Sequence, residues 1–196
     1  MSSLRTGWWM IGCANALVLA GCHSAPTRLH GLDPTEPAAR VHADQAPALR
    51  IDAVNVPAAW DRSEILRPSP AGTLEVSDFD HWSAPLAQMA RQTLSDDLDR
   101  RLPSGTVIYP RLPKPDGALG IDVDILEFTV AASHASMRAS WLIAPAGHPG
   151  NAKRSVALLQ GTMISTEPAA VVRAWSELIG RLADRIAADA ASFKAR

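Results

Sequence analysis

Apolar and polar residues alternate along several stretches of this sequence, which is the pattern of half-buried β-strands. Three long stretches show the alternation, at residues 49–56, 120–130 and 134–144, and a further long strand is predicted at residues 154–164. The last three follow one another with short, turn-rich connections, so they predict an antiparallel meander. Shorter strands are predicted at residues 64–67, 73–76 and 106–109.

The stretch 120–130 changes its alternation partway along. Ile125 belongs to one face of the predicted strand, whereas Phe128 and Val130 belong to the other. A change of parity predicts either a β-bulge near Leu126 or a strand that is buried on both faces toward its end.

Two further stretches repeat apolar residues at helical spacing. The first is predicted to begin at Ser83, whose hydroxyl is able to cap a helix, with Pro85 in the first turn. The second is predicted to begin at Thr166, with Pro168 in its first turn. The solvent side of the first helix is predicted to carry Asp96, Asp97, Arg100 and Arg101. Two amphipathic helices packed on an antiparallel sheet predict a single α+β domain.

The N-terminus has the pattern of a bacterial lipoprotein signal peptide. Arg5 is the sole charged residue before Cys22, and residues 8–19 are almost entirely apolar. This apolar run of about a dozen residues is shorter than the ~20 that a membrane-spanning helix needs. It ends in Leu19-Ala20-Gly21-Cys22, which resembles the lipobox of bacterial lipoproteins. The resemblance implies cleavage after residues 1–21 and acylation of Cys22; an ordinary secretory signal peptide is the alternative.

The residues after the predicted cleavage site divide into a linker and a folded part. Residues 22–48 are rich in proline and poor in aliphatic side chains, which predicts a flexible tether. Leu29 and Leu32 are the residues able to form a short strand within it. The folded domain is predicted over residues 49–196. The residue after Cys22 is His23 rather than Asp, which resembles the sorting signal for the outer membrane, with the inner membrane the less favoured destination.

Composition limits the chemistry of the mature domain. Cys13 leaves with the signal peptide and Cys22 carries lipid, so no thiol or disulfide remains. The formal net charge of −1 is unlike that of nucleic-acid-binding domains. The six histidines show no metal-ligand spacing. No nucleophile elbow or phosphate-binding loop is present. We therefore expect no metal, and no cofactor other than the covalent lipid.

Four tryptophans remain after the predicted cleavage. Trp141 and Trp175 lie on apolar faces, which predicts core positions. Trp60 and Trp82 lie in loop-like segments beside charged residues. An aromatic side chain with a polar handle in such a place either locks a loop or contacts a partner.

The segments around Trp60 and Trp82 carry a family resemblance. Val56-Pro57, Asp61-Arg62, Ile65 with Arg67, and Phe79-Asp80-His81-Trp82-Ser83-Ala84-Pro85-Leu86 resemble, in order and spacing, the PqiC (YmbA) family. The resemblance covers nearly all of the mature chain. It departs from the family pattern at Ala84, where the family usually has Glu, and at Ala58-Ala59, where it has larger side chains.

The resemblance implies a non-enzymatic, lipid-anchored periplasmic adaptor of an ABC-type or MCE-type transport system. Such a system moves lipids or hydrophobic solutes between the inner and outer membranes and maintains the envelope. The implied partners are an MCE-type substrate-binding protein and a permease. The residues expected to contact the partner are Pro57, Trp60, Asp61, Arg62, Asp80, Trp82 and Pro85.

Two other functions stay open at the level of sequence. A lipoprotein hydrolase of the envelope would need an indispensable polar residue such as His81 or Asp122, although Asp122 and Asp124 together are typical of the solvent side of a strand. A structural lipoprotein of outer-membrane assembly is the other alternative. Exposed strand edges are compatible with a homo-oligomer.

Overall fold

The computed structural model describes residues 25–40 and 47–193 of the chain. The predicted signal peptide and Cys22 lie outside the described residues. The elements follow in the order β1 Arg28–His30, β2 Leu49–Asn55, β3 Glu64–Pro68, β4 Leu74–Trp82, α1 Leu86–Arg101, β5 Leu119–Val130, β6 His134–Pro145, the 3-10 turn η1 Pro149–Asn151, β7 Lys153–Thr162 and α2 Pro168–Ala191.

The strands form two sheets, which we call the large sheet (order β2-β5-β6-β7) and the small sheet (order β1-β4-β3). The predicted α+β class and the antiparallel meander of β5, β6 and β7 are confirmed. The prediction of a purely antiparallel sheet is wrong, because β2 runs parallel to β5 and β1 runs parallel to β4. Alternation reports which face a residue occupies but not the direction of the neighbouring strand. The chain between β2 and β5 includes α1, which is the long crossover that a parallel pair requires.

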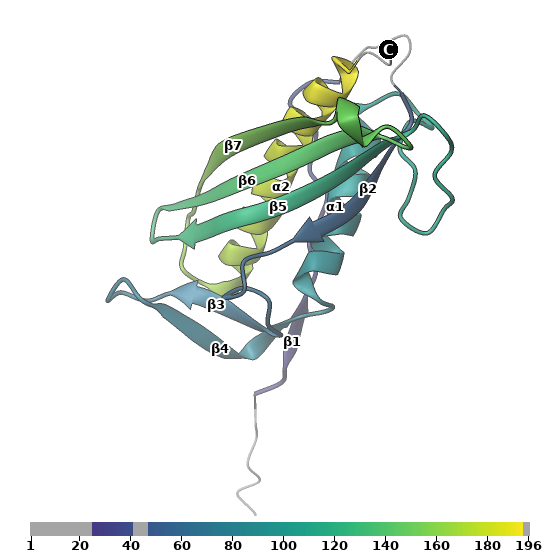
Figure 1. Ribbon diagram of the computed structural model, residues 1–196. Coiled ribbons are helices and arrows are strands. Elements are labelled where there is room, and N and C mark those ends of the chain that lie inside the picture. Colours follow the sequence, from purple (N-terminus) through teal and green to yellow (C-terminus); the bar gives the residue numbers. More distant parts are fainter. Residues whose placement is uncertain (1–24, 41–46, 194–196) are drawn as a thin grey trace, which may run out of the picture.

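Both helices pack against the same face of the large sheet (Figure 1). Helix α1 contacts β2 at one edge, and α2 contacts β6 and β7 at the other. The small sheet lies beyond the end of the large sheet, where α2 begins beside β3 (Figure 1). The opposite face of the large sheet is exposed along β5, where Asp122 and Asp124 point into solvent. The domain therefore has one helical layer and leaves one sheet face open.

The core contains the tryptophans that the sequence assigned to it. Trp175 is fully buried and Trp141 is 4% exposed. The indole nitrogen of Trp141 donates to Asp189 at 3.0 Å, which joins β6 to α2. With no cysteine among the described residues, the packing of these side chains supplies the cohesion that a disulfide would otherwise add.

Of the two alternatives that the change of parity in β5 left open, the structure has the bulge. The register between β5 and β6 shifts between Ile125 and Glu127, and Leu126 is 47% exposed. The extra residue lets Phe128 and Val130 turn toward the core in the second half of the strand, where both are buried.

Both helices begin later than predicted. Helix α1 begins at Leu86 after Pro85, without a side-chain cap. The hydroxyl of Ser83 instead donates to the sulfur of Met89, and its backbone N–H donates to the carbonyl of His30. Ser83 is thus used to hold β1, since the preceding strand continues to Trp82.

Helix α2 begins at Pro168, the residue predicted for its first turn, but the N-cap residue is Glu167 rather than Thr166. Residues 106–109 do not form a strand, because Val107 makes only an isolated bridge to Leu49. Strand β4 is longer than the predicted 73–76. The register between β3 and β4 shifts partway along, which interrupts the alternation of β4. The sequence pattern therefore did not show the full length of this strand.

Residues 28–36, which we call the N-terminal strap, belong to the fold although they lie within the tether predicted over residues 22–48. Its first part is β1, and its second part crosses both helices. The backbone N–H of Asp33 donates to Ser176 of α2 at 3.1 Å, and that of Thr35 donates to Asp97 of α1 at 2.8 Å. Few aliphatic residues are needed for this packing because hydrogen bonds hold the segment, so its composition resembles that of a linker.

A glycine in the middle of α2 allows the strap to lie against the helix. A Cβ at Gly180 would overlap the side-chain oxygen of Thr35 and would lie 3.0 Å from its Cβ. Glycine in a helix interior costs about 1 kcal/mol relative to alanine. The close approach of Thr35 explains why position 180 is a glycine.

Gly180→Ala is therefore expected to destabilise the domain by about 1–3 kcal/mol, because the overlap with Thr35 outweighs the gain in helix propensity. Urea unfolding measures the destabilisation. Adding Thr35→Gly to the Gly180→Ala variant is expected to reduce the destabilisation, because it removes the side chain that the new Cβ would overlap. Gly161→Ala is the control, since its Cβ would meet nothing closer than 3.6 Å. A Gly180→Ala variant more stable than the wild type would contradict the packing of the strap on α2.

Candidate functional site

The two segments that carry the family resemblance lie side by side. The backbone N–H of Trp82 donates to the carbonyl of Ser63 at 2.7 Å, and Glu64 pairs with His81 across β3 and β4. The turn that contains Trp60 and the residues that lead into α1 are thus joined through the small sheet. Residues separated by about twenty positions in the sequence form one surface.

The two tryptophans of these segments point into the core. Trp60 is 3% exposed and Trp82 is 5% exposed. Trp60 makes edge contacts with Phe128 at 4.8 Å and with Trp175 at 5.9 Å between ring centroids, and its indole nitrogen donates to the carbonyl of Phe128 at 3.0 Å. Of the two uses that the sequence left open for Trp60, the structure supports locking of the loop.

Asp80 is also buried, at 2% exposure, and it fastens β1 to the small sheet. Its carboxylate accepts hydrogen bonds from Arg28, His30 and Ser77, each at 2.7 Å. Burial alone would raise the pKa of Asp80, but the hydrogen bonds from Arg28, Ser77 and His30 outweigh it and lower the pKa to about 2. Asp80 is therefore ionised at neutral pH and holds the strap in place.

The remaining residues of the predicted contact surface face solvent to different degrees. Asp61, Arg62 and Pro85 are exposed, and Pro57 is half-buried. Arg62 pairs with Glu64 at 3.1 Å. Of the seven predicted residues, these four are placed where a partner is able to reach them.

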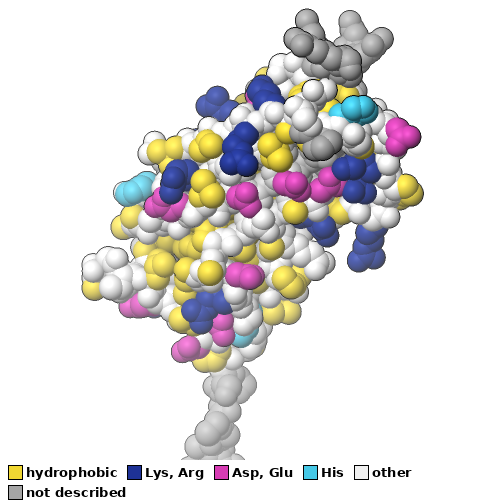
Figure 2. Space-filling view, viewed as in Figure 1, with side chains coloured by type: hydrophobic (Ala, Val, Ile, Leu, Met, Phe, Trp, Pro, Cys, Tyr) yellow, Lys and Arg dark blue, Asp and Glu magenta, His cyan; other side chains and the backbone are white. Residues whose placement is uncertain are grey.

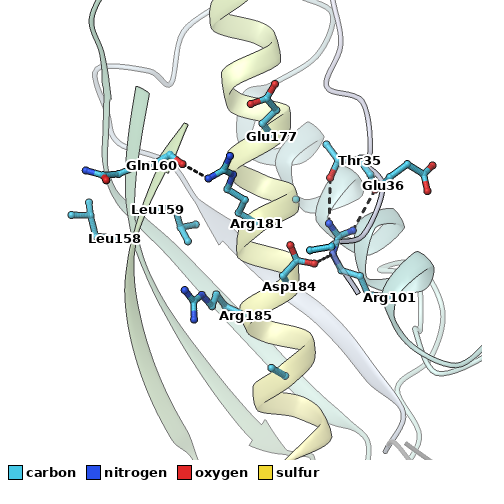
Figure 3. A pocket seen from close by; sticks show the side chains of 13 residues that line it. Thr35, Glu36, Arg101, Leu158, Leu159, Gln160, Glu177, Arg181, Asp184 and Arg185 are labelled. Atoms are coloured by element: carbon cyan, nitrogen blue, oxygen red, sulfur yellow. Dashed lines mark hydrogen bonds and ion pairs between the residues drawn. The ribbon is translucent and has the colours of Figure 1, made fainter. Parts of the chain in front are cut away.

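A groove of about 720 Å³ lies along the outer side of α2 (Figure 3). One wall comes from β7, with Leu158, Leu159 and Gln160. The other wall comes from the strap, with Thr35 and Glu36, and from Arg101 of α1. The helix itself contributes charged side chains of both signs, which are Glu177, Arg181, Asp184 and Arg185.

Arg101 and Asp97 form a buried ion pair beside this groove, although the sequence predicted both on the solvent side of α1. Their side chains are 1% and 0% exposed and lie 2.9 Å apart. Arg101 also pairs with Asp184 of α2 at 2.6 Å, and its guanidinium donates to Thr35. Burial raises the pKa of Asp97 despite the hydrogen bonds from Thr35 and the charge of Arg101. The strap covers this pair, which explains why a polar helix face is buried.

Strand β7 is the edge strand of the large sheet, and the direction of its backbone groups can be assigned. The N–H of Met163 donates to Ser133, next to the start of β6, so the odd-numbered residues of β7 point toward β6. Consistently, the carbonyl of Gln160 accepts a hydrogen bond from Arg181 of α2 (Figure 3). The backbone groups of Val156 and Leu158 therefore point outward along the free edge. Their side chains are 61% and 63% exposed.

The described residues contain no arrangement typical of a metal site. No group of three His, Cys, Asp or Glu side chains in residues 25–40 and 47–193 lies close enough to hold a metal ion. His81 lies in β4 of the small sheet and Asp122 in β5 of the large sheet, so the two residues considered for a hydrolase are on separate sheets. In the same ranges, no helix is both long enough and apolar enough to cross a bilayer.

Sequence reasoning missed the groove, the strap and the edge of β7. The visible signal for the strap was Gly180, because a glycine inside a strongly amphipathic helix usually marks a close approach. The other residues gave no signal, since Thr35, Asp97 and Arg101 are common in linkers and on exposed helix faces.

Comparison with known proteins supplies a family and a fold. The model of the family described as "ABC-type transport auxiliary lipoprotein component" matches residues 30–187. No curated protein matches the sequence. A crystal structure of an uncharacterized protein is similar with a TM-score of 0.67 at 16% identity, covering 84% of this chain and 99% of that chain. The crystal structure of protein XCC0632 from Xanthomonas campestris, of family DUF330, is similar with a TM-score of 0.63 at 14% identity, covering 82% and 93%. At these identities, the structural likeness shows the fold alone.

Asp80→Asn is expected to lower the free energy of unfolding by about 2 kcal/mol at pH 7, because the pKa of Asp80 in the folded protein is well below its unfolded value. A lowered folded pKa stabilises the fold above the unfolded pKa, and the contribution is lost as the pH falls through the folded pKa. The difference between wild type and variant should therefore shrink between about pH 4 and about pH 2. Urea unfolding at several pH values measures it.

Asp122→Asn is the control for Asp80→Asn, because Asp122 is exposed on the open face of the large sheet. A change within about 0.5 kcal/mol is expected there. An Asp80→Asn variant with a constant stability difference across this pH range would show that the carboxylate does not hold β1.

Proposed function

Because the chain belongs to the family of ABC-type transport auxiliary lipoprotein components, we propose that it is a lipid-anchored periplasmic adaptor of such a transport system. The family match, which spans residues 30–187, also confirms the resemblance to the PqiC (YmbA) family. The match begins in the strap and ends in α2, so it includes the large sheet, most of the small sheet, α1 and most of α2. Family membership is the observation that carries the proposal.

The finer parts of the proposal concern place, cargo and partners. The lipobox supports acylation of Cys22, and His23 after it favours the periplasmic face of the outer membrane. The cargo is a lipid or another hydrophobic solute that moves between the two membranes, and envelope integrity depends on this transport. The partners are an MCE-type substrate-binding protein and a permease.

The free edge of β7 is the surface that fits a protein partner best. Its outward backbone groups at Val156 and Leu158 are able to pair with an extended segment of another chain. The two exposed side chains supply apolar contact, and the adjacent groove offers Arg181 and Arg185 as hydrogen-bond donors. We therefore assign an extended segment of the transporter's periplasmic component to this edge.

Val156→Lys together with Leu158→Lys is expected to reduce co-purification of the transporter component by about tenfold, which corresponds to ~1.4 kcal/mol. Lysines on an edge strand disfavour the addition of a further strand. Both side chains are exposed, so the fold should be retained, as circular dichroism checks. The assay uses acylated protein purified from detergent-solubilised membranes.

Leu112→Lys is the matched control, because Leu112 is 55% exposed and lies in the loop before β5. A photo-crosslinking residue at position 158 should capture an MCE-type protein or permease identified by mass spectrometry, whereas position 112 should not. Unchanged co-purification with the double variant would exclude the β7 edge. The exposed residues Asp61, Arg62 and Pro85 stay a prediction as a second contact, which Arg62→Glu tests in the same assay.

A further inference from the structure

Exposed apolar side chains gather on the small sheet. Nine large hydrophobic residues are exposed in the described part of the chain, and four of them lie on β1 and β4. They are Leu29, Leu74, Val76 and Phe79. This concentration on a three-stranded sheet needs an explanation, because scattered apolar residues are ordinary on a protein surface and clustered ones usually mark a contact.

Two of these residues project from the outer face of the small sheet. Leu29 pairs with His81 across β1 and β4, and Phe79 precedes His81 by two positions, so all three share a face. Asp80 and Trp82 alternate with them and are buried. Leu29 is 68% exposed and Phe79 is 43% exposed, so both point away from the core.

The distance along the chain from the proposed lipid anchor to this face is short. Cys22 precedes Arg28 by only six positions. A fully extended chain spans at most about 3.3–3.6 Å per residue, so Arg28 lies within about 20 Å of the acylated cysteine. Asp80 fixes Arg28 to the small sheet through a 2.7 Å ion pair. The small sheet is therefore the part of the domain held nearest to the membrane, rather than a body on the long tether that residues 22–48 predicted.

We propose that the outer face of the small sheet lies on the bilayer that carries the lipid anchor, with Leu29 and Phe79 contacting the boundary between headgroups and acyl chains. This presupposes the acylation of Cys22 proposed above. Exposed apolar side chains on an otherwise polar protein surface are able to lie in the membrane interface. Arg28 belongs to the opposite face of β1, where it pairs with Asp80, so the proposed membrane contact rests on Leu29 and Phe79.

Side chains of both charge signs lie on this surface. We therefore expect the surface to orient the domain on the membrane and not to supply the affinity for the membrane. On the lower end of the molecule in Figure 2, hydrophobic side chains lie among Arg, Asp, Glu and His side chains. Arg67 pairs with Glu75 at 2.8 Å on the small sheet, so the positive charge there is partly compensated. Affinity for the membrane comes from the acyl chains, and the sheet selects one orientation. In that orientation, the small sheet faces the bilayer and the far end of α2 points away from it (Figure 1).

An environment-sensitive fluorophore tests this orientation in acylated, full mature protein reconstituted in vesicles of phosphatidylethanolamine and phosphatidylglycerol. Since Cys22 carries lipid and Cys13 leaves with the signal peptide, a cysteine introduced by Leu29→Cys or Phe79→Cys is the sole thiol for labelling. We expect emission from positions 29 and 79 to rise about twofold or more on reconstitution, because the probe leaves water for the interface. Lipids with a nitroxide near the headgroup should quench it.

Leu112→Cys is the control, because its exposure of 55% is similar and it lies in the loop before β5, away from the small sheet. Its emission should not change. Vesicle flotation of each labelled protein tests the acylation of Cys22 separately from the orientation of the small sheet. Protein that floats but shows no change at positions 29 and 79 overturns the membrane-facing sheet and leaves acylation standing. Protein that does not float overturns acylation, and with it this orientation.

Discussion

The carboxylate of Asp80 connects the N-terminal part of the chain to everything that follows it. It is buried and accepts hydrogen bonds from Arg28, His30 and Ser77. With β1 held at the small sheet, the strap continues across both helices and reaches Thr35 beside Gly180. The small sheet, the helices and the strap are thereby fixed relative to one another. A domain without any described cysteine depends on such contacts for its rigidity.

The same constraint relates the two surfaces that the molecule offers. The strap brings the chain out at the small sheet, only six positions after the proposed lipid anchor. The free edge of β7 belongs to the large sheet, whose strands run from the small sheet toward the opposite end (Figure 1). A domain lying on a membrane through one sheet and presenting a strand edge from the other is able to hold a partner in a defined direction. A long flexible linker would not give that direction.

Much of the fold could be read from single residues and their spacing. The parity change around Leu126 indicated either a bulge or a strand buried on both faces, because a strand has a strict period of two. The core positions of Trp141 and Trp175 followed from their place on apolar faces. The candidate surface was less accessible to this reasoning. Trp60 and Trp82 were recognised as unusual, but whether an indole beside charges points inward depends on side chains such as Phe128, which is far away in the sequence.

The sequence by itself determined the local properties of this protein: the lipobox pattern, the two helices, the three strands of the meander, and the apolar faces of these elements. These follow from periodicity and short-range chemistry, which a linear pattern records. The tertiary structure alone decided the direction of β2 and β1 beside their partners, the burial of Asp97 and Arg101, and the packing of a proline-rich segment against two helices. Each depends on contacts between distant residues. A polar side chain is exposed or buried according to what lies on top of it, and here that cover comes from the strap some sixty residues earlier in the chain.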